Sequence, residues 1–160
     1  MRLTIPAFSE AGARMASWRT PSMRSRTRRP LSSGSTCTSA ARPAYDAAQK
    51  ALKYASKTTP KEKALIKALA TRYSATGSGN RAPLDSAGAK AIGAVWQRFP
   101  ADDDVAALYA EALMDLRPWN YWMRDGRPYP GTQDIARALD AVVARNSEHP
   151  GALHLSIHLW

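Results

Sequence analysis

From residue 43 onward, apolar residues recur at intervals of three and four, the spacing of amphipathic helices. This pattern predicts six helices separated by short runs that contain Gly, Pro or Asn. The first helix covers 43–57, and the third covers 83–99. The second begins at Thr59-Pro60, the fourth just after Pro100, the fifth at Thr132, and the sixth near His149-Pro150.

Two of the expected helix starts carry strong capping signals. Thr59 followed by Glu62 forms a capping box, with Pro60 at the first helical position. Three consecutive aspartates, 102–104, open the fourth helix, where negative charge stabilises the amino-terminal end. We also expect Thr132 to cap the fifth helix.

The apolar stripes predict which side chains face the core. The clearest stripe lies in the fourth helix and comprises Val105, Leu108, Tyr109, Ala112, Leu113 and Leu116. In the fifth helix the inward residues are Ile135, Ala138, Leu139, Val142 and Val143. In the second they are Leu65, Ile66, Leu69 and Tyr73.

A long aromatic loop, 113–132, interrupts the helical pattern between the fourth and fifth helices. Trp, Tyr and Arg dominate the energetics of protein interfaces, so this loop is a candidate for binding a protein or peptide, and its rings could also stack on nucleic-acid bases. The candidate partner-binding residues are Trp119, Tyr121, Trp122, Arg124 and Arg127.

A structural interpretation of the loop competes with the binding interpretation. Trp119 and Trp122 would then pack against the helices, and Asp125-Gly126 would form a turn. We expect most of the aromatic side chains to be structural, with only the tip at 124–127 free to contact a partner.

The histidines suggest a possible metal site. His154 and His158 are four residues apart, so both rings lie on one helical face, and His149 begins the same helix. No general base follows the first histidine as in HExxH, and no carboxylate or Cys cluster lies nearby. We therefore expect no bound metal and no catalytic residues. If a metal does bind, His154 and His158 are the candidate ligands.

The net charge of +10 is concentrated at the amino-terminal end. Residues 1–42 contain eight Arg, no Lys and one acid, which gives +7, whereas residues 43–160 carry only +3. Three interpretations of the basic segment remain open: a wrong-frame translation of GC-rich DNA, a flexible basic tail that contacts nucleic acid, and an organelle transit peptide. In each case we expect residues 1–42 to be disordered, because they hold little apolar surface to bury.

Other features exclude several classes of protein. The single cysteine, Cys37, rules out an internal disulfide framework. No apolar run is long enough for a membrane span, and no compact apolar segment follows a basic start as in a secretory signal. The cytoplasm is the default compartment.

Three helix starts align as a repeat when Pro60, Pro100 and Pro150 are placed in one column. Large residues follow nine positions after each proline. Ten positions after the proline, the first two units have the small residues Ala70 and Ala110, whereas the third unit has Trp160. This column resembles the tetratricopeptide repeat (TPR). The intervals of 40 and 50 residues exceed that family's 34, so both units carry insertions.

A longer stretch is similar to a group of uncharacterised bacterial TPR proteins. The similarity rests on residues 108–119, the pair Tyr121-Trp122, the triplet 149–151, and the two later histidines. Proteins of this group are longer at both ends and often carry a secretory signal. The resemblance implies that this chain is a carboxy-terminally truncated fragment behind a leader that does not match.

These patterns together predict an all-α fold in which antiparallel helical hairpins stack as a TPR-like α-solenoid. The leader would cover 1–42 and the repeat domain 43–160. Because stacked hairpins expose an extended concave face, we expect a non-catalytic scaffold that binds a protein or peptide and needs no cofactor. One alternative is a metal-binding protein or part of an enzyme that uses His149, His154 and His158. The other is weak, nonspecific nucleic-acid binding through the Arg-rich segment.

Overall fold

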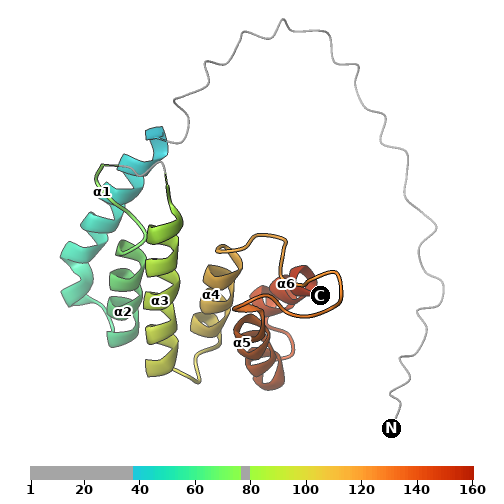
Figure 1. Cartoon of the computed structure of the whole chain (residues 1–160). Coiled ribbons are helices and arrows are strands. Elements are labelled where there is room, and N and C mark those ends of the chain that lie inside the picture. The colour runs from blue at the N-terminus through green and yellow to red at the C-terminus, as the bar shows by residue number, and fades with distance from the viewer. Residues whose placement is uncertain (1–37, 77–79) are drawn as a thin grey trace, which may run out of the picture. The chain divides into compact units, whose positions relative to one another are not determined.

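Six α-helices make up most of the computed structural model, which describes residues 38–76 and 80–160 (Figure 1). The helices are α1 (Thr38–Tyr54), α2 (Pro60–Ala70), α3 (Ala82–Arg98), α4 (Asp103–Met114), α5 (Thr132–Arg145) and α6 (Pro150–Leu159). A 3₁₀ turn, Ala55–Lys57, follows α1. The described residues contain no β-strand, so the all-α prediction is confirmed.

Each helix packs against the next one in the chain, and α4 also packs against α6. Helices α1 to α4 stand side by side in chain order (Figure 1). Ion pairs join α2 and α4 at both ends. Near the starts of the two helices, Lys61 Nζ lies 2.6 Å from Asp102 Oδ2. Just beyond their ends, Arg72 Nη2 lies 2.7 Å from Asp115 Oδ2. The two helices therefore run in the same direction, and α3 returns between them.

Local signals in the sequence explain where the helices begin. Both hydrogen bonds of the capping box between Thr59 and Glu62 form, and donation from the Thr59 backbone lowers the pKa of Glu62. Asp102 accepts from the Val105 backbone N–H at 3.0 Å, and a hydrogen bond from Lys61 lowers the pKa of Asp102. The predicted starts of α2 and α4 are thus confirmed.

Two predicted starts are wrong in detail. Helix α1 begins at Thr38, five residues before Pro43, and the rest of the predicted leader lies outside the described residues. At α5 the capping position is Gly131, with a φ of 91° that suits glycine, and Thr132 is the first helical residue. The Thr132 hydroxyl donates instead to the Tyr121 carbonyl at 2.7 Å, which ties the preceding loop to the helix.

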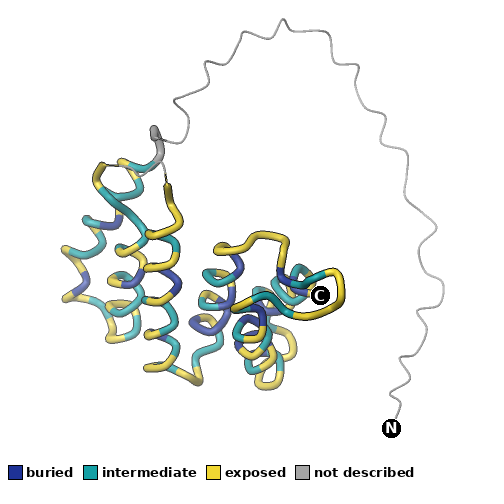
Figure 2. The backbone as a smooth tube through the Cα atoms, viewed as in Figure 1, coloured by how far each residue is buried: buried dark blue, intermediate teal, exposed yellow. Residues whose placement is uncertain are grey.

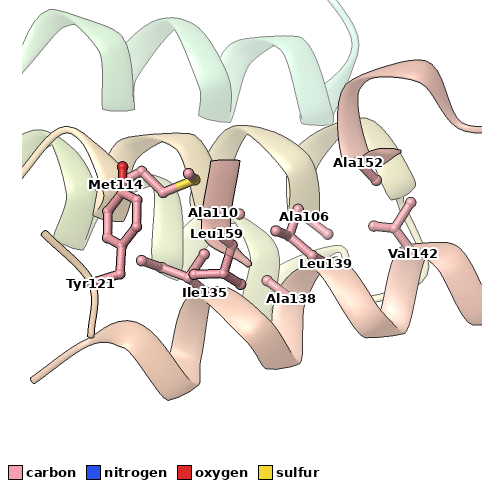
Figure 3. Packing of buried hydrophobic residues seen from close by; sticks show 10 residues of the cluster. All are labelled: Ala106, Ala110, Met114, Tyr121, Ile135, Ala138, Leu139, Val142, Ala152 and Leu159. Atoms are coloured by element: carbon pink, nitrogen blue, oxygen red, sulfur yellow. The ribbon is translucent and has the colours of Figure 1, made fainter. Parts of the chain in front are cut away.

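Buried side chains gather in two clusters. The larger joins α4, α5 and α6 with one loop residue, Tyr121, and the smaller joins α2, α3 and α4 around Ala68, Val95 and Val105. The tube in Figure 2 shows buried residues along α4 and α5. Figure 3 shows the larger cluster, in which Leu139 and Ile135 of α5 face Ala106 and Ala110 of α4. The predicted inward face of α5 is therefore confirmed.

The predicted stripe on α4 is wrong for two of its largest members. Leu108 and Leu116 are exposed, whereas the buried face consists of Val105, Ala106, Ala107, Ala110 and Met114. Helix α4 has three helical neighbours, and backbones that approach so closely leave room mainly for alanine. Leu69 of α2, which was also expected to be inward, is exposed as well.

The positions aligned by the proposed repeat differ in their surroundings. Ala110 is fully buried, Ala70 is half-buried and Trp160 is exposed. The hairpins are thus not equivalent in packing. None of the helices in the described ranges has the length and apolarity that a membrane crossing would need.

Candidate functional site

The aromatic loop between α4 and α5 folds back on itself as a small hairpin. The Met123 backbone N–H donates to the Arg127 carbonyl at 2.8 Å, and Trp122 and Pro128 form an isolated antiparallel bridge. Gly126 adopts a φ of 82° in the turn, as expected from the Asp125-Gly126 pair.

Two aromatic side chains hold the loop to the helices. The Tyr121 side chain is 7% exposed and lies beside Met114 in the larger cluster (Figure 3). The Trp122 indole N–H donates to the Leu159 carbonyl at 2.7 Å, and the ring stacks on Trp160 with centroids 5.0 Å apart. Of the predicted partner-binding residues, these two therefore serve the fold.

Trp119 is not packed into the helices, contrary to the structural interpretation of the loop. It is 76% exposed, and its backbone has a φ of 62°. Its ring meets the His158 ring edge-on, with the two centroids 4.9 Å apart. Helix α4 ends at Met114, and the left-handed backbone of Trp119 directs the indole outward. Arg124 and Arg127 at the tip are exposed, and Arg127 is paired with Asp125 at 2.7 Å.

The three histidines do not form one site. The His149 Nδ1 accepts from the Ala152 backbone N–H at 3.1 Å, and its Nε2 lies 3.3 Å from Asp104 Oδ1, so both ring nitrogens are engaged. His154 and His158 lie together, with their Nε2 atoms 3.2 Å apart. Across the described ranges, no group of three or more His, Cys, Asp or Glu side chains is placed to hold a metal ion.

A hollow that the sequence did not reveal lies between α2, α3 and α4. Its volume is about 240 Å³, and its rim includes the exposed side chains of Leu69 and Leu108. Gly88 of α3 forms part of the lining, and a Cβ atom there would stand 3.4 Å from the Arg72 side chain. Arg72 lies against Gly88 and reaches Asp85 on α3 and Asp115 after α4.

A second, more open hollow of about 510 Å³ lies between α4 and α6. Leu108 and Glu111 of α4 line both hollows, which therefore adjoin along α4. The surface formed by the two hollows, called the α2–α4–α6 face below, runs across the three helices that begin at Pro60, Asp103 and Pro150.

The α2–α4–α6 face is acidic, although the chain as a whole is basic. Its lining carries one guanidinium, that of Arg72, and four carboxylates, those of Asp85, Asp104, Glu111 and Asp115. Arg72 pairs with two of the carboxylates, and Arg81 also pairs with Asp85. Glu111 makes no ion pair with any described residue, so its charge faces the two hollows uncompensated.

No family model, curated protein or solved structure matches this chain.

Proposed function

We propose that this chain is a non-catalytic, TPR-like helical scaffold that binds a protein or peptide segment along the α2–α4–α6 face. The observation that carries the proposal is the pair of exposed leucines on this face. Leu69 and Leu108 are 47% and 41% exposed, and both border the hollow between α2 and α4. Apolar side chains around a concave surface are typical of sites that receive an apolar anchor.

The arrangement of the hairpins supports a repeat scaffold. Helices α2 and α4 run in the same direction and are bridged by ion pairs at both ends, and α4 packs against α6. These contacts support a solenoid, in which corresponding helices of successive hairpins lie along one surface.

The dimensions and charges indicate what kind of partner fits. The open hollow beside α6 measures about 510 Å³, but the hollow between α2 and α4, at about 240 Å³, is smaller than the ~300 Å³ at which small-molecule sites usually begin. It has room for one or two apolar side chains, and the neighbouring hollow extends the surface along α4. The surplus of carboxylates favours a segment that carries Lys or Arg beside its apolar residues.

The proposal is tested by selecting peptides from a random library on the full chain and measuring their affinity by fluorescence polarisation. We expect the selected peptides to combine apolar residues with Lys or Arg. Leu108→Arg should weaken their binding at least about tenfold, because it removes an apolar contact and adds repulsion. Leu108 is exposed within a helix and Arg is a good helix former, so the fold is retained.

Two further variants make the test specific. Leu153→Arg is the matched control, since Leu153 is also an exposed helical leucine but lies outside both hollows. It should leave the affinity unchanged. If Trp119→Ala abolishes binding while Leu108→Arg does not, the aromatic loop is the binding surface and the proposal is wrong.

A further inference from the structure

His154 and His158 bring two imidazole nitrogens close together on the surface of α6. Residues four apart lie on one face of a helix, one turn above the other. The two ring centroids are 4.6 Å apart, and the Nε2 atoms are 3.2 Å apart. His154 is exposed and His158 is half-buried, so solvent reaches the pair.

The separation of the two nitrogens matches that of two ligands on a tetrahedral cation. Zinc–nitrogen bonds of roughly 2.0–2.1 Å at the tetrahedral angle place the two nitrogens about 3.3–3.4 Å apart. Ligands at a right angle, as in square-planar copper(II) or nickel(II), would be about 2.8–3.0 Å apart. The observed 3.2 Å is nearer to the tetrahedral value.

The surroundings hold one of the rings in place. The Trp119 ring meets the His158 ring edge-on, with the two centroids 4.9 Å apart. This contact limits rotation of the His158 imidazole. No described residue makes a hydrogen bond to Nδ1 of His154 or His158. Each Nδ1 can therefore carry the ring proton while both Nε2 lone pairs remain available to a cation.

We infer that His154 and His158 form a two-imidazole site for a tetrahedral divalent cation of the zinc class, with water at the remaining positions. Without a cation, one Nε2–H donates to the other Nε2. When the cation binds, that proton moves through solvent to Nδ1 of the same ring, and two neutral imidazoles ligate the cation. His154 also lines the hollow between α4 and α6, so the site borders the proposed peptide surface, but cation binding does not require a peptide. The site does not include His149, whose nitrogens cap α6 and face Asp104.

The inference is tested by titrating Zn²⁺ into the tag-free full chain, previously treated with a chelator, and following the heat of binding. The Cys37→Ser background removes the one thiolate that could compete for zinc. We expect one zinc ion per chain. His154→Ala and His158→Gln should each weaken binding by at least about tenfold, because the second imidazole no longer binds within the same molecule.

Two controls separate chelation from a nonspecific effect of histidine. His149→Asn keeps a side chain suited to the capping position and should leave zinc affinity unchanged. Ile157→His combined with His154→Ala keeps three histidines but makes the pair adjacent in sequence at an exposed position, which places the rings on different faces of the helix. This variant should bind as weakly as His154→Ala, and circular dichroism verifies that each variant is folded.

The spectrum of bound Co²⁺ gives a readout that a purely structural role for the histidines would not affect. A tetrahedral environment should produce intense visible absorption that is absent from His154→Ala. Equal zinc affinity in the starting protein, His154→Ala and His158→Gln would overturn the inference. So would loss of binding in His149→Asn, which would place the site elsewhere.

Discussion

Leu139→Ala is expected to lower the free energy of unfolding by about 2–5 kcal/mol, the usual range for removing a fully buried leucine side chain. Leu139 is 1% exposed and lies in the cluster that joins α4, α5 and α6. Its neighbours include small alanines such as Ala106 and Ala110 on α4, which cannot extend into the space left behind. Most of the lost contact is therefore replaced by a cavity.

Urea unfolding followed by circular dichroism measures this effect, with Leu153→Ala as the control. Leu153 is also a helical leucine, but its side chain is exposed on α6, so its removal should cost much less. If the two variants lost similar stability, the packing of α5 against α4 and α6 would be wrong.

Ala110→Leu is expected to destabilise the protein by about 1–3 kcal/mol through overpacking. Ala110 is fully buried in the same cluster, on the face of α4 that meets α5 and α6. A leucine side chain there would push the helices apart or force its neighbours out of their preferred rotamers. The small residue is thus a condition for the close approach of the helices.

Ala94→Leu serves as the matched control for overpacking, because Ala94 is exposed in the interior of α3. Leucine and alanine are both good helix formers, so this change should alter stability by less than about 0.5 kcal/mol. Thermal unfolding of the two variants gives the comparison. An Ala110→Leu protein as stable as the parent would contradict the packing of α4 described above.

The sequence predicted the helix starts well where one local interaction determines them. The capping box at Thr59 and the aspartate before α4 act within three residues, so their effect can be inferred without knowing the fold. The start of α5 was less predictable, because two residues there had plausible roles. Gly131 occupies the cap, and the Thr132 hydroxyl bonds to the Tyr121 carbonyl eleven residues earlier.

The inward face of α4 could not be predicted from the sizes of its apolar residues. A helix with one neighbour buries its large side chains, but α4 has three and buries a row of alanines. Leu108 is left on the outer side, where it borders both hollows. Because Leu108 was predicted to face the core, the α2–α4–α6 face could not be predicted from the sequence.

The loop residues differ for reasons that also lie beyond local sequence. Tyr121 and Trp122 reach the helices, whereas Trp119 is turned outward by a left-handed backbone conformation. The spacing of His154 and His158 did predict their proximity, because both lie on one regular helix. The spacing gave no indication that His149 would be engaged by its own helix and by Asp104.

Hydrogen–deuterium exchange of the full chain, with and without a selected peptide, tests the proposed binding surface most directly. If the α2–α4–α6 face binds the peptide, protection should increase in residues 65–72, 104–115 and 150–155, and should stay constant in the loop at 119–129. Protection confined to 119–129, or no peptide that protects the three helical segments, would contradict the account.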